Sequence, residues 1–369
     1  MRKLYEQDII EILYVANVLG PSGGGSLKQG LDMIQGLKDD GEQIELDLLD
    51  VREMRDDAYA VMVAGLGSPV AMLDPDMPRF GPDAVFAYRA FQKAFAAEGK
   101  KLEYLYSGEM GGFNTFTPML VAILSDKDPA KRIKFVDADG NGRAVPELNT
   151  TINAFYDHPP KPMGMGSLYG DEIIVYPTTD HSGEQIARQM CMLYNMRIGF
   201  ATWGMNKEEI TNILDVGCVT KAQKIGKAIL TAKETGSDVM DELKKAFEVR
   251  EFCRGTIEKL DLRAEGGFDF GTTVIKGDDG HTYYIDFKNE NLILRDEKGD
   301  TIMTAPEGIG MIDLNNCFPL TNADTKEGMR VLVTMTPAHP NWWDEDHKAY
   351  TCWLPELKKV GMKGDQVRY

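Results

Sequence analysis

Residues 58–67, AYAVMVAGLG, decide the fold class of this chain. The run is apolar and rich in β-structure formers, so it predicts a strand that is buried on both faces, as at the centre of a parallel sheet. Residues 82–100, PDAVFAYRAFQKAFAAEGK, follow as an amphipathic helix that begins at Pro82 and ends at Gly99. A buried strand followed by such a helix is the building unit of a layered α/β domain.

The same alternation extends to both sides of this unit. Strands are predicted where β-branched, aromatic and aliphatic residues gather, at 43–49, 101–108 and 132–140. Helices are predicted where apolar residues recur at helical spacing, at 4–19, 27–41, 115–126, 146–157, 181–199 and 216–247. Strand and helix in this rhythm predict an α/β layered domain whose loops gather at the strand ends.

The pattern changes at about residue 250, where short strand-like runs are separated by Gly, Asp and Asn turns. This spacing predicts a smaller all-β, barrel-like domain. We therefore expect an α/β domain over 1–247 and an all-β domain over 248–369. The core motifs of the first domain lie within 1–170 and its helices over 182–247 pack back on them, although the exact boundary between 170 and 250 stays open.

Composition excludes several functional classes. The formal net charge of −17 and the absence of Lys/Arg-rich runs argue against nucleic-acid binding. Glu6, Asp8 and Glu11 interrupt the first apolar stretch, so neither a signal peptide nor a membrane span is expected. Five cysteines with no paired spacing predict reduced, buried thiols and a cytoplasmic protein. A homo-oligomer is compatible with this composition.

A first candidate for ligand binding is LGPSGGGSLKQG, residues 19–30. Gly23, Gly24 and Gly25 would let the main chain approach a ligand closely, and the helix that follows offers unpaired N–H groups. The stretch has neither the Lys-Ser/Thr of a phosphate loop nor a leading strand, so no nucleotide cofactor is expected. A flexible turn between two helices explains the glycines equally well.

A second candidate is YSGEMGGFNT, residues 106–115, which lies between a predicted strand and a predicted helix. Such loops line the ligand crevice of layered α/β folds. Glu109 could act as a general base or bind a cation, and Asn114 could orient a substrate amide. The alternative is structural: Asn114 or Thr115 would cap the next helix while the glycines form the turn.

A third candidate is FVDADGNGRAVPEL, residues 135–148. Its acidic start resembles a calcium-binding EF-hand loop, but the twelfth position is Leu148 instead of glutamate and the preceding segment is strand-like, which argues against that motif. Asp137 and Asp139 could instead point into a crevice at the strand end, where Arg143 would clamp an anion. An Asx-turn with an arginine salt bridge is the structural alternative.

A fourth region combines FKNENLIL, residues 287–294, with TPAHPNWWDEDH, residues 336–347. The paired tryptophans could wall a pocket or bind the face of a sugar. The residues of interest in this region are Asn289, Glu290, Asn291, His339, Trp342, Trp343 and His347. Aromatic residues in small β domains are more often part of the core, and the core interpretation is favoured here.

Taken together, these stretches resemble the S-methyl thiohydantoin desulfurase family, formerly a domain of unknown function and often labelled hydantoinase/oxoprolinase-associated. The resemblance covers nearly the whole chain and is carried, in order, by LGPSGGGS, GLGSP, GEMGGFNTFTP, VDADGNGRAVPEL, VGCVTKAQKIGKAI and FKNENLI. It implies an α/β domain, a C-terminal barrel-like domain and hydrolysis of a five-membered cyclic amide. In that reaction water replaces a methylthio group on the ring and methanethiol is released. The sequence departs from the family pattern at Pro21-Ser22 and after Glu147.

The chemistry of this reaction suggests roles for the candidate residues. Glu109 would be the base or a metal ligand, and Asp137 and Asp139 would position water or a divalent cation. The substrate would be bound by a second set: Gly23, Gly24, Gly25, Asn114, Arg143 and Glu147. A hydantoinase-like activity and a non-catalytic role, as a ligand-binding or accessory subunit of a hydantoinase/oxoprolinase system, remain open, and calcium regulation is a third interpretation.

Overall fold

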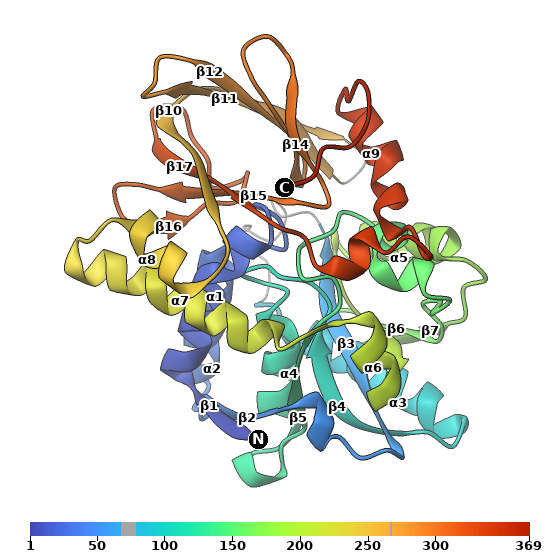
Figure 1. Cartoon of the computed structure of the whole chain (residues 1–369). Coiled ribbons are helices and arrows are strands. Elements are labelled where there is room, and N and C mark those ends of the chain that lie inside the picture. The colour runs from blue at the N-terminus through green and yellow to red at the C-terminus, as the bar shows by residue number, and fades with distance from the viewer. Residues whose placement is uncertain (68–78, 266–267) are drawn as a thin grey trace.

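The computed structural model describes residues 1–67, 79–265 and 268–369 (Figure 1). The chain up to residue 216 forms a mixed sheet, here called the N-terminal sheet, with the strand order β1-β2-β5-β4-β3-β8-β6-β7 and β9 paired beside β5. Neighbours among β2, β5, β4 and β3 are parallel and the remaining pairs are antiparallel. The strands are β1 (Arg2–Tyr5), β2 (Glu45–Leu49), β3 (Ala58–Gly67), β4 (Lys101–Ser107), β5 (Lys134–Asp139), β6 (Met163–Gly166), β7 (Glu172–Val175), β8 (Arg197–Met205) and β9 (Asp215–Val216).

The run that predicted a central strand forms β3, which lies between β4 and β8. Its side chains alternate between two hydrophobic cores: Val61 and Val63 belong to one, and Met62 and Ala64 to the other. Because both faces are covered, nearly every position of this strand must be apolar. The continuous apolar pattern is the direct result of this position.

Helices cover both faces of the N-terminal sheet. The core on one face includes residues of α1, α2, α3, α4, α7 and α8, and the core on the other includes residues of α5, α6 and α9. The helices are α1 (Glu6–Leu19), α2 (Leu27–Asp39), α3 (Pro82–Ala97), α4 (Phe116–Ser125), α5 (Asp180–Leu193), α6 (Lys207–Ile213), α7 (Cys218–Thr235), α8 (Val239–Ala246) and α9 (Trp353–Lys359). The predicted layered α/β arrangement is therefore present.

Some predicted elements are wrong in detail. The helix expected over 146–157 is replaced by two short 3₁₀ turns, Leu148–Thr150 and Ile152–Phe155. Side chains take the N–H groups that would have joined a helix, because Leu148 donates to the Glu184 carboxylate and Ile152 donates to the Asn141 amide. Strands β6, β7 and β8 were not predicted.

The second half contains an antiparallel sheet, here called the C-terminal sheet, with the order β14-β13-β12-β11-β10-β17-β15-β16. The described strands pair as an open path from β14 to β16, so barrel-like closure stays a prediction. The strands are β10 (Arg250–Glu265), β11 (Phe268–Gly277), β12 (Thr282–Lys288), β13 (Glu290–Arg295), β14 (Thr301–Thr304), β15 (Gly308–Asp313), β16 (Phe318–Pro319) and β17 (Arg330–Thr336). The chain after β17 contains two short 3₁₀ turns, Pro340–Trp343 and Ala349–Cys352, and helix α9, which packs on the N-terminal sheet.

One hairpin of the C-terminal sheet positions the site described below. Strands β12 and β13 are joined by a single residue, Asn289, whose φ of 56° lies in the left-handed region that asparagine tolerates best among residues with a side chain. The flanking residues Lys288 and Glu290 face each other across the hairpin. Residues 288–290, called the hairpin tip, are therefore held in a tight and defined turn.

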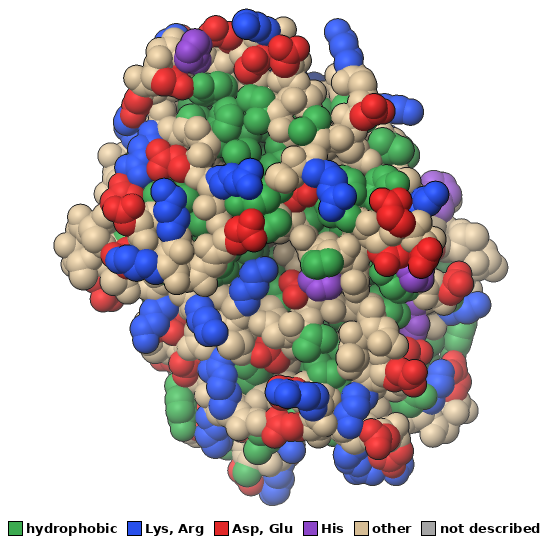
Figure 2. All heavy atoms as spheres, viewed as in Figure 1, with side chains coloured by type: hydrophobic (Ala, Val, Ile, Leu, Met, Phe, Trp, Pro, Cys, Tyr) green, Lys and Arg blue, Asp and Glu red, His purple; other side chains and the backbone are tan. Residues whose placement is uncertain are grey.

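The surface charges, the helices and the cysteines can be compared with what the composition predicted. On the face shown in Figure 2, acidic and basic side chains are intermingled over both sheets. None of the helices in the described parts of the chain has the length and apolar character needed to cross a lipid bilayer. All cysteines have free thiols, and Cys191, Cys218, Cys253 and Cys352 are buried while Cys317 is partly exposed.

Candidate active site

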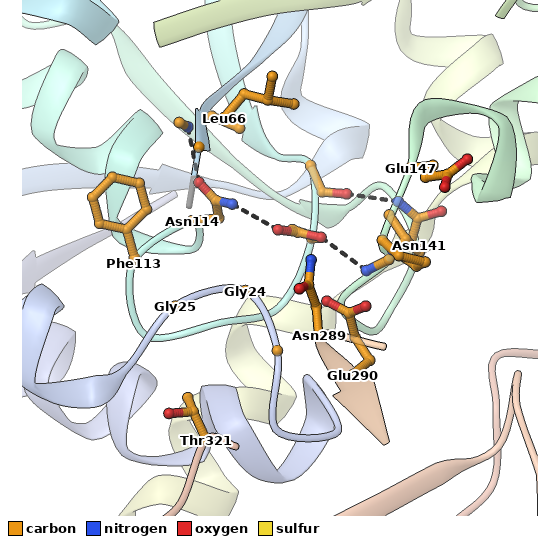
Figure 3. A pocket seen from close by; sticks show the side chains of 18 of the residues that line it. Gly24, Gly25, Leu66, Phe113, Asn114, Asn141, Glu147, Asn289, Glu290 and Thr321 are labelled. Atoms are coloured by element: carbon orange, nitrogen blue, oxygen red, sulfur yellow. Dashed lines mark hydrogen bonds between the residues drawn. The ribbon is translucent and has the colours of Figure 1, made fainter. Parts of the chain in front are cut away.

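A cavity of about 140 Å³ lies where the N-terminal sheet, the glycine-rich stretch and the C-terminal sheet meet (Figure 3). Its wall combines the end of β3, the loops after β4 and β5, helix α5 and the hairpin tip. Three of the four stretches selected from the sequence therefore contribute to one pocket, and the fourth contributes through residues 289 and 290. Its lining includes Gly23, Gly24, Gly25, Glu109, Asn114, Asn141, Glu147, Glu184, Arg188, Trp203, Asp269, Asn289 and Glu290.

Glu109 lies in the loop after β4, and its two carboxylate oxygens are held separately. One oxygen accepts a hydrogen bond of 2.6 Å from the side-chain amide of Asn114, and the other accepts one of 2.9 Å from the backbone N–H of Val145. Burial raises the pKa of Glu109 to about 7, although both hydrogen bonds favour the charged form. A carboxyl group with this pKa can exchange protons at neutral pH.

Asn114 orients this carboxylate. Its oxygen accepts a hydrogen bond of 2.9 Å from the backbone N–H of Gly65 at the end of β3, which leaves its NH₂ group to face Glu109 (Figure 3). Thr115 stands at the N-cap of α4 but makes no side-chain capping bond. Of the two residues in the structural alternative, Thr115 therefore takes the N-cap position and Asn114 does not, and the Asn114 amide instead links Glu109 to the central strand.

Glu290 enters the same pocket from the hairpin tip. It is 2% exposed, and one of its carboxylate oxygens, Oε2, has no hydrogen-bond partner among the residues that the structure describes. Burial and then repulsion from Glu109 raise the pKa of Glu290 to about 8. Two carboxyl groups that repel in this way favour a state in which one is ionised and the other holds a proton.

The glycines serve close packing as well as the pocket wall. Gly24 and Gly25 have φ values of 67° and 83°, and the carbonyl of Gly24 accepts hydrogen bonds from the backbone of Phe113 and Asn114. A Cβ on Gly24 would lie 2.5 Å from the carbonyl oxygen of Met110. The glycine-rich stretch and the loop of Glu109 thus interlock through their main chains, which only residues without a side chain allow.

Asp137 does not join this pocket. Its carboxylate accepts a hydrogen bond of 3.0 Å from the backbone N–H of Thr220 and a second from the Thr220 hydroxyl, at the start of α7. A strand places every second residue on the same face, so Asp137 lies with Phe135 on the side covered by α7. The geometry supports a helix-capping role.

Asp139 is fully buried and is not part of the pocket lining. Its Oδ1 atom accepts hydrogen bonds from the backbone N–H groups of Asn141 and Gly142, at 3.0 and 2.6 Å. This is the Asx-turn that was the structural alternative for the stretch. Burial raises the pKa of Asp139 to about 7. Its contacts shape the loop that presents Asn141 to the pocket.

Arg143 also points away from the pocket. Its guanidinium donates to the carbonyl oxygens of Pro306 and Glu307, at 2.6 and 3.0 Å, and stacks 4.4 Å from the ring centre of Trp353. Burial lowers its pKa to about 10. Arg143 therefore fastens the loop after β5 to the C-terminal half, and the expected salt bridge to Asp139 is absent from the described contacts. The pocket-lining cation is Arg188 on α5.

Glu147 lines the pocket, where its carboxylate pairs with the Lys288 ammonium group. Lys288 is 1% exposed, lies 2.6 Å from Glu356 of α9 and sits 3.9 Å above the ring centre of Phe268. This cluster of two carboxylates, an ammonium group and an aromatic ring joins the loop after β5, the C-terminal sheet and helix α9.

The proposed metal ligands do not converge. Glu109 faces the pocket, Asp137 faces α7, and Asp139 lies in its own turn. Within residues 1–67, 79–265 and 268–369, no group of three or more His, Cys, Asp or Glu side chains is arranged to hold a metal ion.

Sequence reasoning missed the roles of Asn141, Asn289 and Glu290 in the pocket. Asn141 had been considered only as part of a calcium loop. Asn289 and Glu290 belonged to a stretch that could carry chemistry, but the core interpretation was favoured for that region and they were given no role. The core assignment is right for Trp342, which is fully buried. The available signal was the charge of Lys288 and Glu290 beside the apolar run 292–294, since charged residues are rarely buried without a purpose.

Comparison with known proteins now adds to this geometry. The model of the S-Me-THD-like N-terminal domain matches residues 7–177, and that of the S-Me-THD-like C-terminal domain matches residues 178–355. The chain belongs to the S-Me-THD-like family. Both domains of the S-methyl thiohydantoin desulfurase family are thus present. The family models divide the chain within the N-terminal sheet, and the boundary expected at 247/248 stays a prediction.

A solved structure shares the fold of this S-Me-THD-like protein. The crystal structure of a protein from Chromobacterium violaceum, a structural genomics target, covers 100% of both chains with a TM-score of 0.82 and 22% sequence identity. No functionally curated protein matches the chain. In the S-Me-THD-like chain the GLGSP motif extends to Ser68 and Pro69, which lie outside the described residues.

Proposed function

We propose that this S-Me-THD-like protein is a hydrolase that replaces the methylthio group of an S-methyl thiohydantoin by oxygen. The observation that carries the proposal is the pairing of Glu109 and Glu290 in one small pocket, with pKa values raised to about 7 and about 8. Water attack on a ring carbon needs a base for the water and an acid for the ring nitrogen, and this pair supplies both near neutral pH.

The reaction uses each carboxyl group twice, once to take up a proton and once to release one. Glu109 takes a proton from water while the water oxygen bonds to the ring carbon that carries sulfur. The π electrons of the ring C=N bond move to nitrogen, which takes the proton of Glu290. The carbon–sulfur bond then breaks, sulfur leaves with the proton held by Glu109, and the remaining hydroxyl proton returns to Glu290. Water and substrate are thereby converted to a hydantoin and methanethiol, and both carboxyl groups regain their initial states.

The pocket also offers groups that hold the substrate. Arg188 takes over the anion-binding role first assigned to Arg143. Its Nε atom donates to Glu184 at 2.5 Å and one terminal nitrogen donates to the Pro146 carbonyl at 3.0 Å, which fixes the guanidinium plane at the pocket wall. A negatively charged ring substituent would pair with the same guanidinium.

The activity is tested by incubating the purified protein with S-methyl thiohydantoin, hydantoin and 5-oxoproline, each with and without divalent metal ions. We expect release of methanethiol from the first compound, measured as free thiol, together with formation of hydantoin. Ring opening of hydantoin would favour the hydantoinase-like alternative. Binding of any of these rings without turnover would favour an accessory subunit.

The pH dependence follows from the two carboxyl groups. Glu109 must be ionised, so activity rises as pH increases through about 7, and Glu290 must be protonated, so activity falls as pH increases through about 8. Arg188 and Arg143 lower the pKa of Glu109, and Arg143 and Lys288 lower that of Glu290, so both limbs already include these charges. We expect a bell-shaped profile of kcat/KM with its maximum between the two values.

The profile is checked with steady-state rates of thiol release from pH about 5 to about 10. The Glu290→Gln variant serves as the comparison, because it removes the group assigned to the basic limb. A rate that stays constant across this range would contradict the assignment of an acid and a base to the pair.

A further inference from the structure

Asp269 and Asn289 form a second polar pair on the pocket wall, and neither has a role in the steps above. The backbone N–H of Asn289 donates to the carbonyl of Asp269 at 2.7 Å, and the backbone N–H of Asp269 donates to the side-chain oxygen of Asn289 at 2.9 Å. These two bonds tie the start of β11 to the hairpin tip. The two side chains are therefore held next to each other by the backbone.

The contacts fix which end of the Asn289 amide faces the cavity. A backbone N–H can only donate, so the atom that it reaches must be the amide oxygen. The NH₂ group is left as the free end, and it has no hydrogen-bond acceptor within the described parts of the chain. In Figure 3 the Asn289 side chain points toward the centre of the pocket, beside Glu290. Asn289 thus presents a donor to a ligand.

Asp269 presents the opposite group. The residue is 5% exposed and lines the pocket, yet no donor within residues 1–67, 79–265 and 268–369 hydrogen-bonds its carboxylate. A buried carboxylate without a donor is costly, so such a group is expected to receive one from a ligand or from water. Asp324, another acid of this wall, is different because the Thr321 backbone N–H donates to it at 3.2 Å and the Thr321 hydroxyl at 2.5 Å.

We propose that Asp269 and Asn289 read the amide edge of the substrate ring: the Asp269 carboxylate accepts the ring N–H that lies beside a carbonyl, and the Asn289 amide donates to that carbonyl oxygen. This inference rests on the proposed function and adds the part of the ring that is recognised. An acceptor and a donor side by side match the donor and acceptor of a cyclic amide. The ring carbon that carries sulfur then stays free to face Glu109 and Glu290.

The test is a cycle of ligands and variants measured by isothermal titration calorimetry. The ligands are hydantoin and 3-methylhydantoin, in which a methyl group replaces the N–H between the two carbonyls. We expect this methyl group to weaken binding to the wild-type protein by at least about tenfold, because the Asp269 acceptor loses its donor. In the Asp269→Ala variant we expect the two ligands to bind within about twofold of each other.

Two further variants sharpen the assignment. Asn289→Asp keeps the oxygen that accepts from Asp269 and tolerates the left-handed φ, but it removes the donor. This variant should weaken the binding of both ligands by the same factor. The ratio of the dissociation constants of 3-methylhydantoin and hydantoin should therefore stay as in the wild type. Asp324→Ala is the matched control, because Asp324 is an acid of the same pocket wall whose carboxylate already has hydrogen-bond donors. In this variant the ratio of the two dissociation constants should equal that of the wild type. Thermal unfolding of each variant verifies that it is folded.

The outcomes separate this inference from the proposed function. Methanethiol release by the wild type, together with an unchanged ligand ratio in Asp269→Ala, would overturn the ring-edge assignment and leave the activity in place. If the dissociation constants show the expected ratios but no methanethiol is released, the assignment of Asp269 and Asn289 to the amide edge would be supported and the catalytic proposal would be overturned. Failure of the wild type to bind hydantoin would overturn the ring edge, whatever the thiol assay shows.

Discussion

The Glu109→Gln variant is expected to lose at least about 10³-fold in kcat for methanethiol release, because the amide cannot accept a proton from water. Glutamine is isosteric with glutamate, and its oxygen can still accept a hydrogen bond from Asn114 or Val145. The melting temperature should therefore stay close to that of the wild type. Thiol-release kinetics give kcat and thermal unfolding gives the melting temperature, both measured on the same preparation.

Glu103→Gln is the matched control for this variant. Glu103 belongs to the same strand, β4, but its side chain is 33% exposed and pairs with Arg55 at the surface. We expect its kcat to equal that of the wild type. Asp137→Asn provides a second comparison, because Asp137 caps α7 outside the pocket and its loss should spare most of the activity. Full activity of Glu109→Gln would end the assignment of the base.

The Lys288→Met variant is expected to destabilise the protein by about 3–5 kcal/mol, which is the usual cost of removing one partner from a buried ion pair. Methionine fills a similar volume, but Glu147 and Glu356 would lose the buried ammonium group that both contact. They would keep only the half-exposed ammonium group of Lys359, which lies 2.8 Å from Glu356 and 3.9 Å from Glu147. The free energy of unfolding is measured by urea denaturation, and an unchanged slope with urea would verify that the unfolding reaction is the same.

Lys28→Met is the control, because Lys28 forms an exposed ion pair with Asp32 on α2. Its loss is expected to cost less than about 1 kcal/mol. Equal effects of the two substitutions would contradict the view that Lys288 stabilises the packing of α9 and the hairpin tip. The catalytic rate gives a further readout, since Lys288 lowers the pKa of Glu290, and its removal should shift the basic limb of the pH profile upward.

Most of the order of helices and strands could be predicted from the sequence, because β3, α3 and their neighbours have clear periodicity. The main omission was β6, whose sequence Met-Gly-Met-Gly is typical of a loop. The structure explains its glycines: a Cβ on Gly164 would lie 2.5 Å from the carbonyl oxygen of Ala87, and one on Gly166 would lie 2.2 Å from that of Asp83. Close approach of α3 requires glycine where strand propensity favours branched residues.

The candidate site was predictable where the residues follow one another in the chain. Glu109, Asn114 and the glycines were found because a loop after a strand commonly lines a ligand crevice. Asp137 was wrongly grouped with them, because local sequence does not reveal which face of a strand borders a cavity. Glu290 was named in the fourth stretch but was given no role in the site, because its place depends on how one sheet docks on another and that long-range arrangement leaves no local pattern.

The single-residue connection at Asn289 has a consequence for how the protein fails when it is warmed. The base lies in a loop of the N-terminal sheet and the acid lies at the hairpin tip of the C-terminal sheet. A turn of one residue is too short to let Glu290 stay beside Glu109 if one sheet shifts against the other. A small separation of the two sheets would therefore abolish catalysis while each sheet kept its own secondary structure. The highest temperature at which the enzyme works is then set by the stability of the contact between the two sheets. On heating, the catalytic rate should fall before the circular dichroism signal of the secondary structure does.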